Sequence, residues 1–227
     1  MKKSLLIAAM VVFGTASLHA QESESHMPVT LGFKVGIPVT DMFSASNTTQ
    51  FGNNTTVPGS VFTSAVPRYE FGVSGEFHLP KHLRFEVDGL FKRGGFNSAL
   101  PFAGGGLAYN PTTFNQWEIP GLFKYNVAMG HFRPFIDFGA SLRHISTITQ
   151  TTDEAGLSFG PVIGDNSFAL HNRNSFGGVA GFGFTFKKGP FELTPEARYT
   201  RWANEAFEYT GFHTNLDQGD VLLGISF

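Results

Sequence analysis

The chain of 227 residues contains no cysteine. This absence excludes disulfide bonds, thiolate metal sites and a lipid anchor attached to a cysteine. A small secreted domain commonly needs disulfides for its stability, whereas a protein held by a membrane does not. The lack of cysteine therefore argues against a small disulfide-rich domain and is compatible with a membrane-held protein.

The sequence also has few charges and no long apolar run. Only 15% of the residues are charged. After the N-terminal segment, no stretch has the roughly 18 consecutive apolar residues that indicate a transmembrane helix. The sequence has no basic patch that would indicate a nucleic acid partner, and its formal net charge of −2 is small. We therefore expect no transmembrane helix and no nucleic acid partner.

The first 20 residues, MKKSLLIAAMVVFGTASLHA, have the features of a secretory signal peptide. Lys2 and Lys3 form a basic start, and the apolar run from Leu5 to Phe13 is too short to span a bilayer. Cleavage is expected after Ala20, although Leu18 is bulkier than the small residue usual at its position. We predict a signal peptide over residues 1–20 and one domain over residues 21–227; the alternative for the first segment is a buried helix.

Phenylalanine and glycine are abundant instead. The chain has 26 Phe and 27 Gly, which is unusual for a water-soluble domain with so few charges. A closed β-barrel in a membrane accommodates this composition, because its outer surface is apolar and its interior can be polar.

Eight segments alternate apolar and polar or small residues with a period of two, as β-strands do. In the third segment, for example, Phe85 and Val87 alternate with Arg84, Glu86 and Asp88. The segments are residues 29–37, 69–79, 83–92, 117–127, 132–144, 176–186, 191–199 and 219–227. We predict an all-β fold, an eight-stranded antiparallel up-and-down transmembrane β-barrel.

The predicted connections are short at one end and long at the other. Three turns lie around Pro80, Met129 and Gly189. The four long loops cover residues 39–67, 95–113, 145–175 and 203–217. Outer-membrane barrels have short periplasmic turns and long extracellular loops. A soluble sandwich or lipocalin-like barrel would more often have short loops at both ends and would direct its apolar face inward.

Ionisable residues of both signs lie opposite the aromatic faces, and we expect them to converge in the lumen. They are Lys34, Glu76, Arg84, Glu86, Asp88, Lys92, Glu118, Lys124, Arg133, Asp137, Arg143, Glu192, Glu196 and Arg198. Buried charges must be paired or hydrated. The pattern favours a structural network of ion pairs that fills the barrel, and the alternative is a narrow porin-like channel for small solutes. An eight-stranded barrel is too narrow for a wide diffusion pore.

The chain ends on Phe227, directly after an alternating apolar strand. This ending resembles the C-terminal aromatic residue of outer-membrane proteins that the barrel assembly machinery recognises. We therefore expect Phe227 to act as an assembly signal and this machinery to be a partner.

The stretches WEIPGLFKYNV and HFRPFIDFGASL together resemble a paired-strand pattern of the OmpA/OmpX-like outer membrane protein beta-barrel domain family. The matching residues are Trp117, Ile119, Pro120, Leu122, Phe123, Lys124, Tyr125, Pro134, Phe135 and Gly139. The resemblance implies a porin-like, barrel-only protein of a Gram-negative outer membrane, in contact with membrane lipid and lipopolysaccharide. Its motifs carry architecture and no chemistry, so we expect a structural or surface-interaction role without enzymatic activity.

One enzymatic alternative remains at LRHIST. Some eight-stranded barrels that deacylate lipid A use an H-x-S-N run with a nearby glutamate, and His144 and Ser146 have the same spacing. Serine, histidine and a carboxylate together support acyl transfer. However, Thr147 replaces the asparagine, and the nearest candidate carboxylate, Glu154, falls in a predicted loop.

No other motif indicates a metal or a cofactor. His78 and His82 flank a turn and are expected to face opposite sides, and GGVAGFG lies in a strand with no helix after it. We expect no cofactor and no metal. The uncharged stretch between Asp41 and Val66 is expected to be an exposed loop, which can contact an extracellular ligand such as a host or phage surface.

Overall fold

The computed structural model describes residues 29–40, 48–51, 55–58, 62–64, 68–101, 107–127, 132–154, 157–163, 170–209 and 212–227. The predicted signal peptide lies outside these residues, so its cleavage after Ala20 stays a prediction. No helix of the described residues is long and apolar enough to cross a membrane.

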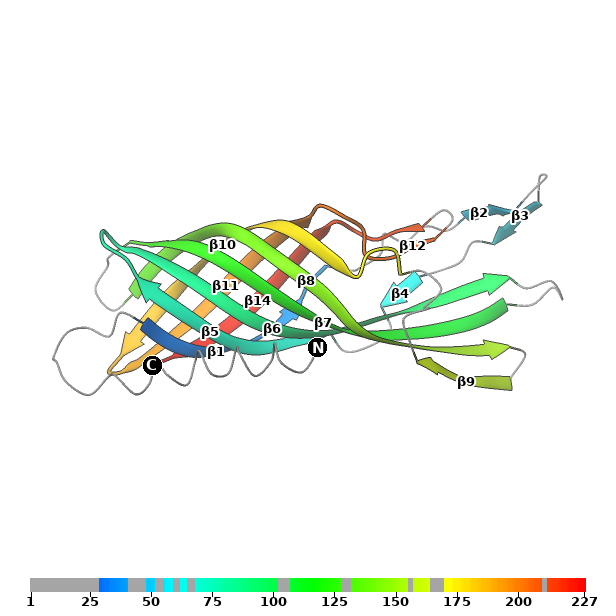
Figure 1. Ribbon diagram of the computed structural model, residues 1–227, viewed down its shortest axis with the longest axis horizontal. Coiled ribbons are helices and arrows are strands. Elements are labelled where there is room, and N and C mark those ends of the chain that lie inside the picture. The colour runs from blue at the N-terminus through cyan, green and yellow to red at the C-terminus, as the bar shows by residue number, and fades with distance from the viewer. Residues whose placement is uncertain are drawn as a thin grey trace, which may run out of the picture.

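Eight antiparallel strands close into a barrel, which confirms the predicted fold (Figure 1). They are β1 (Val29–Pro38), β5 (Tyr69–His78), β6 (Leu83–Pro101), β7 (Leu107–Asn126), β8 (Phe132–Glu154), β10 (Asn174–Lys188), β11 (Phe191–Trp202) and β14 (Asp217–Ser226). Each strand pairs with the next barrel strand in the chain, and β1 pairs with β14 to close the ring. No barrel edge is left unpaired, which a membrane interior requires.

The period of two places the apolar residues on the outside of the barrel. Ile136, Phe138 and Phe182 are 60%, 61% and 59% exposed, while Asp137, which lies between the first two, is buried and faces inward. Aromatic rings form rows on the outer surface, because they lie opposite one another on neighbouring strands. One row contains Phe77, Phe85, Phe123 and Phe138, with neighbouring ring centroids 5.0–6.5 Å apart. Such a surface suits lipid better than water.

The connections at one end of the barrel are short, and the C-terminus lies at that end (Figure 1). We call it the turn end and the opposite end the loop end. Several predicted loops at the loop end are in fact strands. β6 and β7 extend through most of residues 95–113, and β8 extends to Glu154 and pairs with β9 (Leu157–Ile163). The prediction of loops there was wrong because the Gly-, Asn- and Thr-rich sequences of these segments lose the apolar alternation, although their backbones continue the strand pairing.

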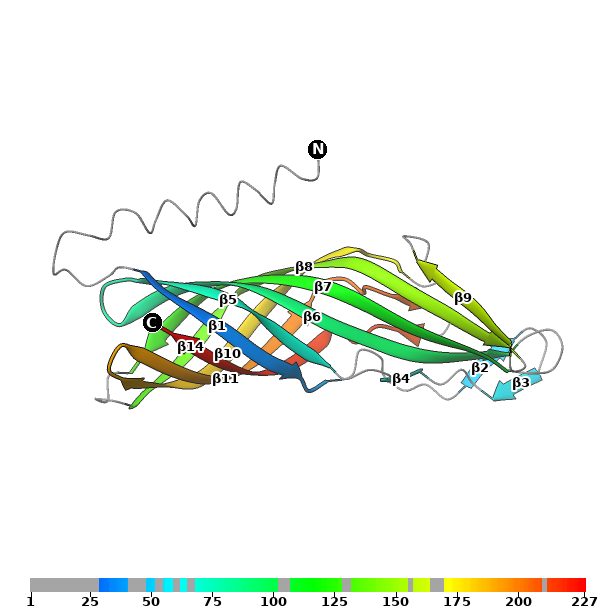
Figure 2. The same ribbon diagram turned by 90° about the horizontal axis from the view of Figure 1, so that it is seen from below.

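Further short strands lie in the other long connections. β4 (Phe62–Ser64) pairs with β6, β2 (Thr48–Phe51) pairs with β3 (Thr55–Pro58), and β12 (Glu208–Tyr209) pairs with β13 (Phe212–His213). Beyond the loop end, β4, β6, β7, β8 and β9 therefore form an open antiparallel sheet (Figure 2). We call this five-stranded extension the platform.

The turn between β5 and β6 is strained. Lys81 and His82 both have left-handed backbone conformations, with φ angles of 63° and 64°. Two-residue hairpin turns of this kind prefer Asn-Gly, because other side chains cost free energy at positive φ.

We therefore predict that the double substitution Lys81→Asn and His82→Gly stabilises the barrel by about 1 kcal/mol. Urea unfolding of the refolded protein in lipid vesicles measures this change. Lys188→Asn, at an exposed cation on the same end with ordinary backbone angles and no ion pair among the described residues, is the control and should have almost no effect. A double variant no more stable than this control would contradict the prediction.

Candidate functional site

The inward faces of the barrel strands carry the charged residues predicted from the sequence. The structure places Lys34, Glu86, Asp88, Lys92, Glu118, Lys124, Asp137, Arg143, Glu192, Glu196 and Arg198 in buried positions of the lumen. Glu76, Arg84 and Arg133 are less buried, because they lie closer to the turn end. The period of two thus directs the charges into the lumen as the apolar side chains cover the outside.

The network in the turn-end half of the lumen is centred on Lys34. Its Nζ lies 2.5 Å from Glu86 Oε1, 3.1 Å from Asp88 Oδ2 and 2.9 Å from Glu196 Oε2. Arg198 contacts the same three carboxylates, through Nη2, at 2.5–3.4 Å. Two cations from β1 and β11 therefore share three carboxylates from β6 and β11 across the barrel axis.

Two more cations extend this network toward the turn end. Lys124 Nζ lies 2.5 Å from Glu86 Oε2 and 3.3 Å from Glu76 Oε2. Arg84 donates to Glu76 and lies 3.2 Å from Glu192 Oε2. The network thus connects β1, β5, β6, β7 and β11, and it fills the space that these strands enclose.

A second network lies in the loop-end half of the lumen. Lys92 Nζ lies 2.8 Å from Glu70 Oε2, 2.8 Å from Glu118 Oε2 and 3.0 Å from Asp220 Oδ2. Gln218 donates its amide to Asp220 at 2.8 Å. Our sequence-based set of lumen charges missed Glu70 and Asp220, although both lie on the polar face of an alternating segment.

Not every lumen charge is matched. Both carboxylate oxygens of Asp137 are buried and have no hydrogen-bond partner among the described residues. Arg143 donates to the Ser175 hydroxyl at 3.1 Å, and its guanidinium lies 4.2 Å from the ring centroid of Trp202. Carboxylates outnumber cations among the buried lumen residues, so the lumen has an acidic character.

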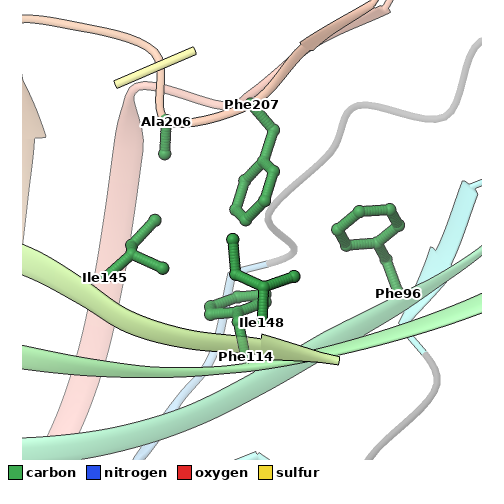
Figure 3. Packing of buried hydrophobic residues seen from close by; sticks show 6 residues of the cluster. All are labelled: Phe96, Phe114, Ile145, Ile148, Ala206 and Phe207. Carbon is green, nitrogen blue, oxygen red and sulfur yellow. The ribbon is translucent and has the colours of Figure 1, made fainter. Parts of the chain in front are cut away.

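An apolar cluster lies above these networks at the loop end of the barrel (Figure 3). It consists of Phe96, Phe114, Ile145, Ile148, Ala206 and Phe207, with Leu170 packed against it. The ring of Phe207 lies 5.5 Å from that of Phe96 and 5.3 Å from that of Phe114. The strands β6, β7 and β8 supply one side of this cluster, and the segment between β11 and β12 supplies the other.

Hydrogen bonds hold the connecting segment in this position. Phe207 donates its N–H to the Thr214 hydroxyl at 2.8 Å. The Ala206 carbonyl accepts N–H groups from His171 at 2.9 Å and Asn172 at 3.1 Å. The sequence predicts a loop over residues 203–217, and no residue pattern there indicates that Phe207 packs over the lumen.

Between the ion pairs and the turn end lies a polar cavity of about 20 Å³. Hydroxyls and charges line it, among them Thr30, Ser74, Glu76, Glu192 and Thr194. A cavity of this size holds about one water molecule. It does not hold a solute.

The residues considered for lipid A deacylation do not assemble into a catalytic group. His144 Nδ1 lies 2.7 Å from Asn174 Oδ1, and the Ser146 hydroxyl donates to the Asn115 carbonyl at 3.2 Å. The pairing of β7 with β8 shifts register beside Asn115, so Ser146 occupies a β-bulge. Glu154 lies on the same strand, about 26 Å further along from Ser146. The two-residue spacing suggested a pair, but the bulge gives each side chain a different partner.

The described residues contain no group of three or more His, Asp or Glu side chains arranged to hold a metal ion. GGVAGFG lies within β10 and continues as a strand, as the sequence pattern indicated.

Comparisons with known proteins agree with this architecture. Residues 19–201 match the family described as outer membrane protein beta-barrel domain. No curated protein matches the sequence. The solved structure of the outer membrane protein OprG from Pseudomonas aeruginosa is 13% identical and has a TM-score of 0.53, with 88% of this chain and 94% of that chain covered. At that identity the likeness shows the fold alone.

Two other solved structures are more distant in shape. Neisserial surface protein A is 14% identical, covers 89% of this chain and 98% of its own, and has a TM-score of 0.45. Ail, the attachment invasion locus protein of Yersinia pestis in complex with the heparin analogue sucrose octasulfate, is 11% identical, covers 88% of this chain and 98% of its own, and has a TM-score of 0.38.

Proposed function

Since the chain belongs to the outer membrane protein beta-barrel domain family, we propose that this integral protein of the Gram-negative outer membrane has a filled, non-conducting lumen and a structural or surface-interaction role. The apolar belt and the polar lumen suit that location. The turn end then faces the periplasm and the loop end faces the exterior.

The filled lumen is the observation that carries this proposal. Lys34, Lys92, Lys124 and Arg198 are buried and contact carboxylates from facing strands. Above them, Phe207 and its apolar neighbours cover the loop end. A solute would have to displace buried ion pairs and a packed apolar cluster, and both displacements are costly.

The platform supports the surface-interaction role. Its paired strands extend past the loop end of the barrel, so they hold a contact surface in a more fixed arrangement than unpaired loops would (Figure 2). The extracellular ligand itself is not identified by any described residue. Among the described residues, His144 and Ser146 bond to Asn174 and to the Asn115 carbonyl and not to each other, so the lipid A deacylase alternative has no support in their geometry.

The C-terminal strand supports the proposed assembly signal. Phe227 is 59% exposed on the outer surface, and its ring centroid lies 6.4 Å from that of Phe33 on the first strand. Its N–H donates to the Leu31 carbonyl at 3.0 Å. Phe227 therefore lies at the seam between the first and last strands, where a factor that closes the barrel would need to act.

Single-channel recording tests the filled lumen against the alternative of a narrow channel. The refolded protein in a planar bilayer should give no reproducible conductance steps, because the ion pairs and the apolar cluster block the axis. Heat-modifiable migration of the same sample confirms that the barrel is folded. Reproducible small steps, with an ion selectivity that Lys124→Glu changes, would instead establish a channel.

A further inference from the structure

Three polar side chains form a row on the outer surface of the barrel near the loop end. Tyr69 on β5 lies opposite Arg93 on β6, and Arg93 lies opposite Asn115 on β7. Directly opposite residues of neighbouring strands have Cβ atoms about 5 Å apart. Tyr69 and Arg93 are exposed, and Asn115 is half-buried. The row thus offers a phenol hydroxyl, a guanidinium and an amide within about 10 Å.

An apolar surface continues directly below this row. Two residues along each strand toward the turn end lie Phe71, Phe91 and Trp117, with neighbouring ring centroids 5.3 Å apart. Val73 and Ile119 follow them and are about half exposed. The polar row therefore lies about 7 Å above the aromatic row along the strands, at the level where lipid headgroups meet acyl chains.

The charge of this surface has one sign. Among the described outward-facing residues of β5, β6 and β7, Arg93 is positive and none is a carboxylate. No described side chain forms an ion pair with Arg93. Arg201, at the same end on β11, differs, because it lies 2.7 Å from Asp217 Oδ1 and is neutralised within the protein.

We propose that Tyr69, Arg93 and Asn115 bind a phosphate group of lipopolysaccharide, the phosphorylated glycolipid of the outer leaflet. Arg93 donates two parallel N–H groups to phosphate oxygens, as guanidinium groups do. Tyr69 and Asn115 donate from either side, and the acyl chains lie against Phe71, Phe91 and Trp117. This site goes beyond the proposed function and does not depend on whether the lumen conducts.

Native mass spectrometry of the full barrel in detergent, titrated with bis-phosphorylated lipid A, tests the site. Arg93→Gln should weaken binding about tenfold, because it removes the charge-assisted hydrogen bonds. The affinity of Arg93→Lys for lipid A should lie between those of the unaltered protein and Arg93→Gln, since a lysine keeps the charge and loses the paired donors. Arg201→Gln is the matched control and should bind lipid A as the unaltered protein does.

The lipid can be varied as well as the protein. Lipid A without phosphate should bind the unaltered barrel as weakly as bis-phosphorylated lipid A binds the Arg93→Gln variant, and this comparison needs no variant to fold. Binding by Arg93→Gln within twofold of the unaltered protein, or an equal loss in Arg201→Gln, would overturn the site. Phosphatidylglycerol that competes equally with lipid A would overturn its assignment to the glycolipid.

Discussion

Replacing Lys34 with methionine should lower the free energy of unfolding by about 3–5 kcal/mol, because it removes one of the two cations that the buried carboxylates of Glu86, Asp88 and Glu196 share. The Lys34 side chain is 3% exposed, and the side chains of Glu86, Asp88 and Glu196 around it are 0–4% exposed. Methionine fills nearly the same volume, so the loss reports the charge and not a cavity. Urea unfolding in lipid vesicles measures it.

Lys187→Met is the control for this experiment. Lys187 also contacts a carboxylate, Glu192 at 3.4 Å, but its side chain is 45% exposed. Exposed ion pairs contribute at most about 1 kcal/mol. If Lys34→Met costs no more than Lys187→Met, water reaches the Lys34 network freely and the lumen is not filled as the geometry indicates.

Gly139→Ala should prevent the barrel from folding, or destabilise it by more than the about 1–3 kcal/mol typical of an overpacked core. A Cβ atom on Gly139 would overlap the backbone carbonyl of Gly121 on the neighbouring strand. Gly72 has the same relation to Gly89. In both pairs the glycine lies opposite an inward leucine, Leu90 or Leu122, so these glycines allow the sharp curvature of a small barrel.

Gly178→Ala provides the matched control, because no atom lies within 4 Å of a Cβ built at Gly178. Gly139 lies on β8, and Gly178 lies on the neighbouring strand β10, which pairs with β8. Heat-modifiable migration after refolding distinguishes the two variants. A Gly139→Ala protein that folds in the same yield as Gly178→Ala would show that the strands can separate enough to admit the methyl group.

The period-two pattern was sufficient to predict the barrel part of the fold. On strands such as β6, successive residues alternate between the lipid-facing surface and the lumen. The burial of the side chains and the polarity of the sequence therefore have the same period of two. The direction of each charged residue follows from that pattern. Glu70 and Asp220 follow it too, since both lie on the polar face of a predicted strand and are buried in the lumen.

The pattern was not sufficient beyond the membrane. Beyond Arg93 and Trp117 the sequence of the strands is rich in Gly, Asn and Thr, so apolar alternation no longer marks a strand although the backbone pairing continues. The position of Phe207 depends on hydrogen bonds to Thr214, which lies 7 residues away across a hairpin. The bulge at Ser146 depends on the register between β7 and β8. Pairing of this kind is a property of the folded chain, and a single sequence does not reveal it.

The sequence separation of the residues in the Lys34 network also constrains how the barrel folds and inserts into the membrane. Lys34 belongs to the first barrel strand, but its partners Glu86, Asp88 and Glu196 lie 52, 54 and 162 residues further along the chain. Until the seventh barrel strand arrives, the first strand carries a cation whose counter-charges are incomplete, and hydrocarbon does not tolerate such a group. Contacts of such long range also slow folding. The first strand therefore cannot insert into the membrane alone. Insertion requires that nearly the whole chain is present, so that all eight barrel strands can pair in one step.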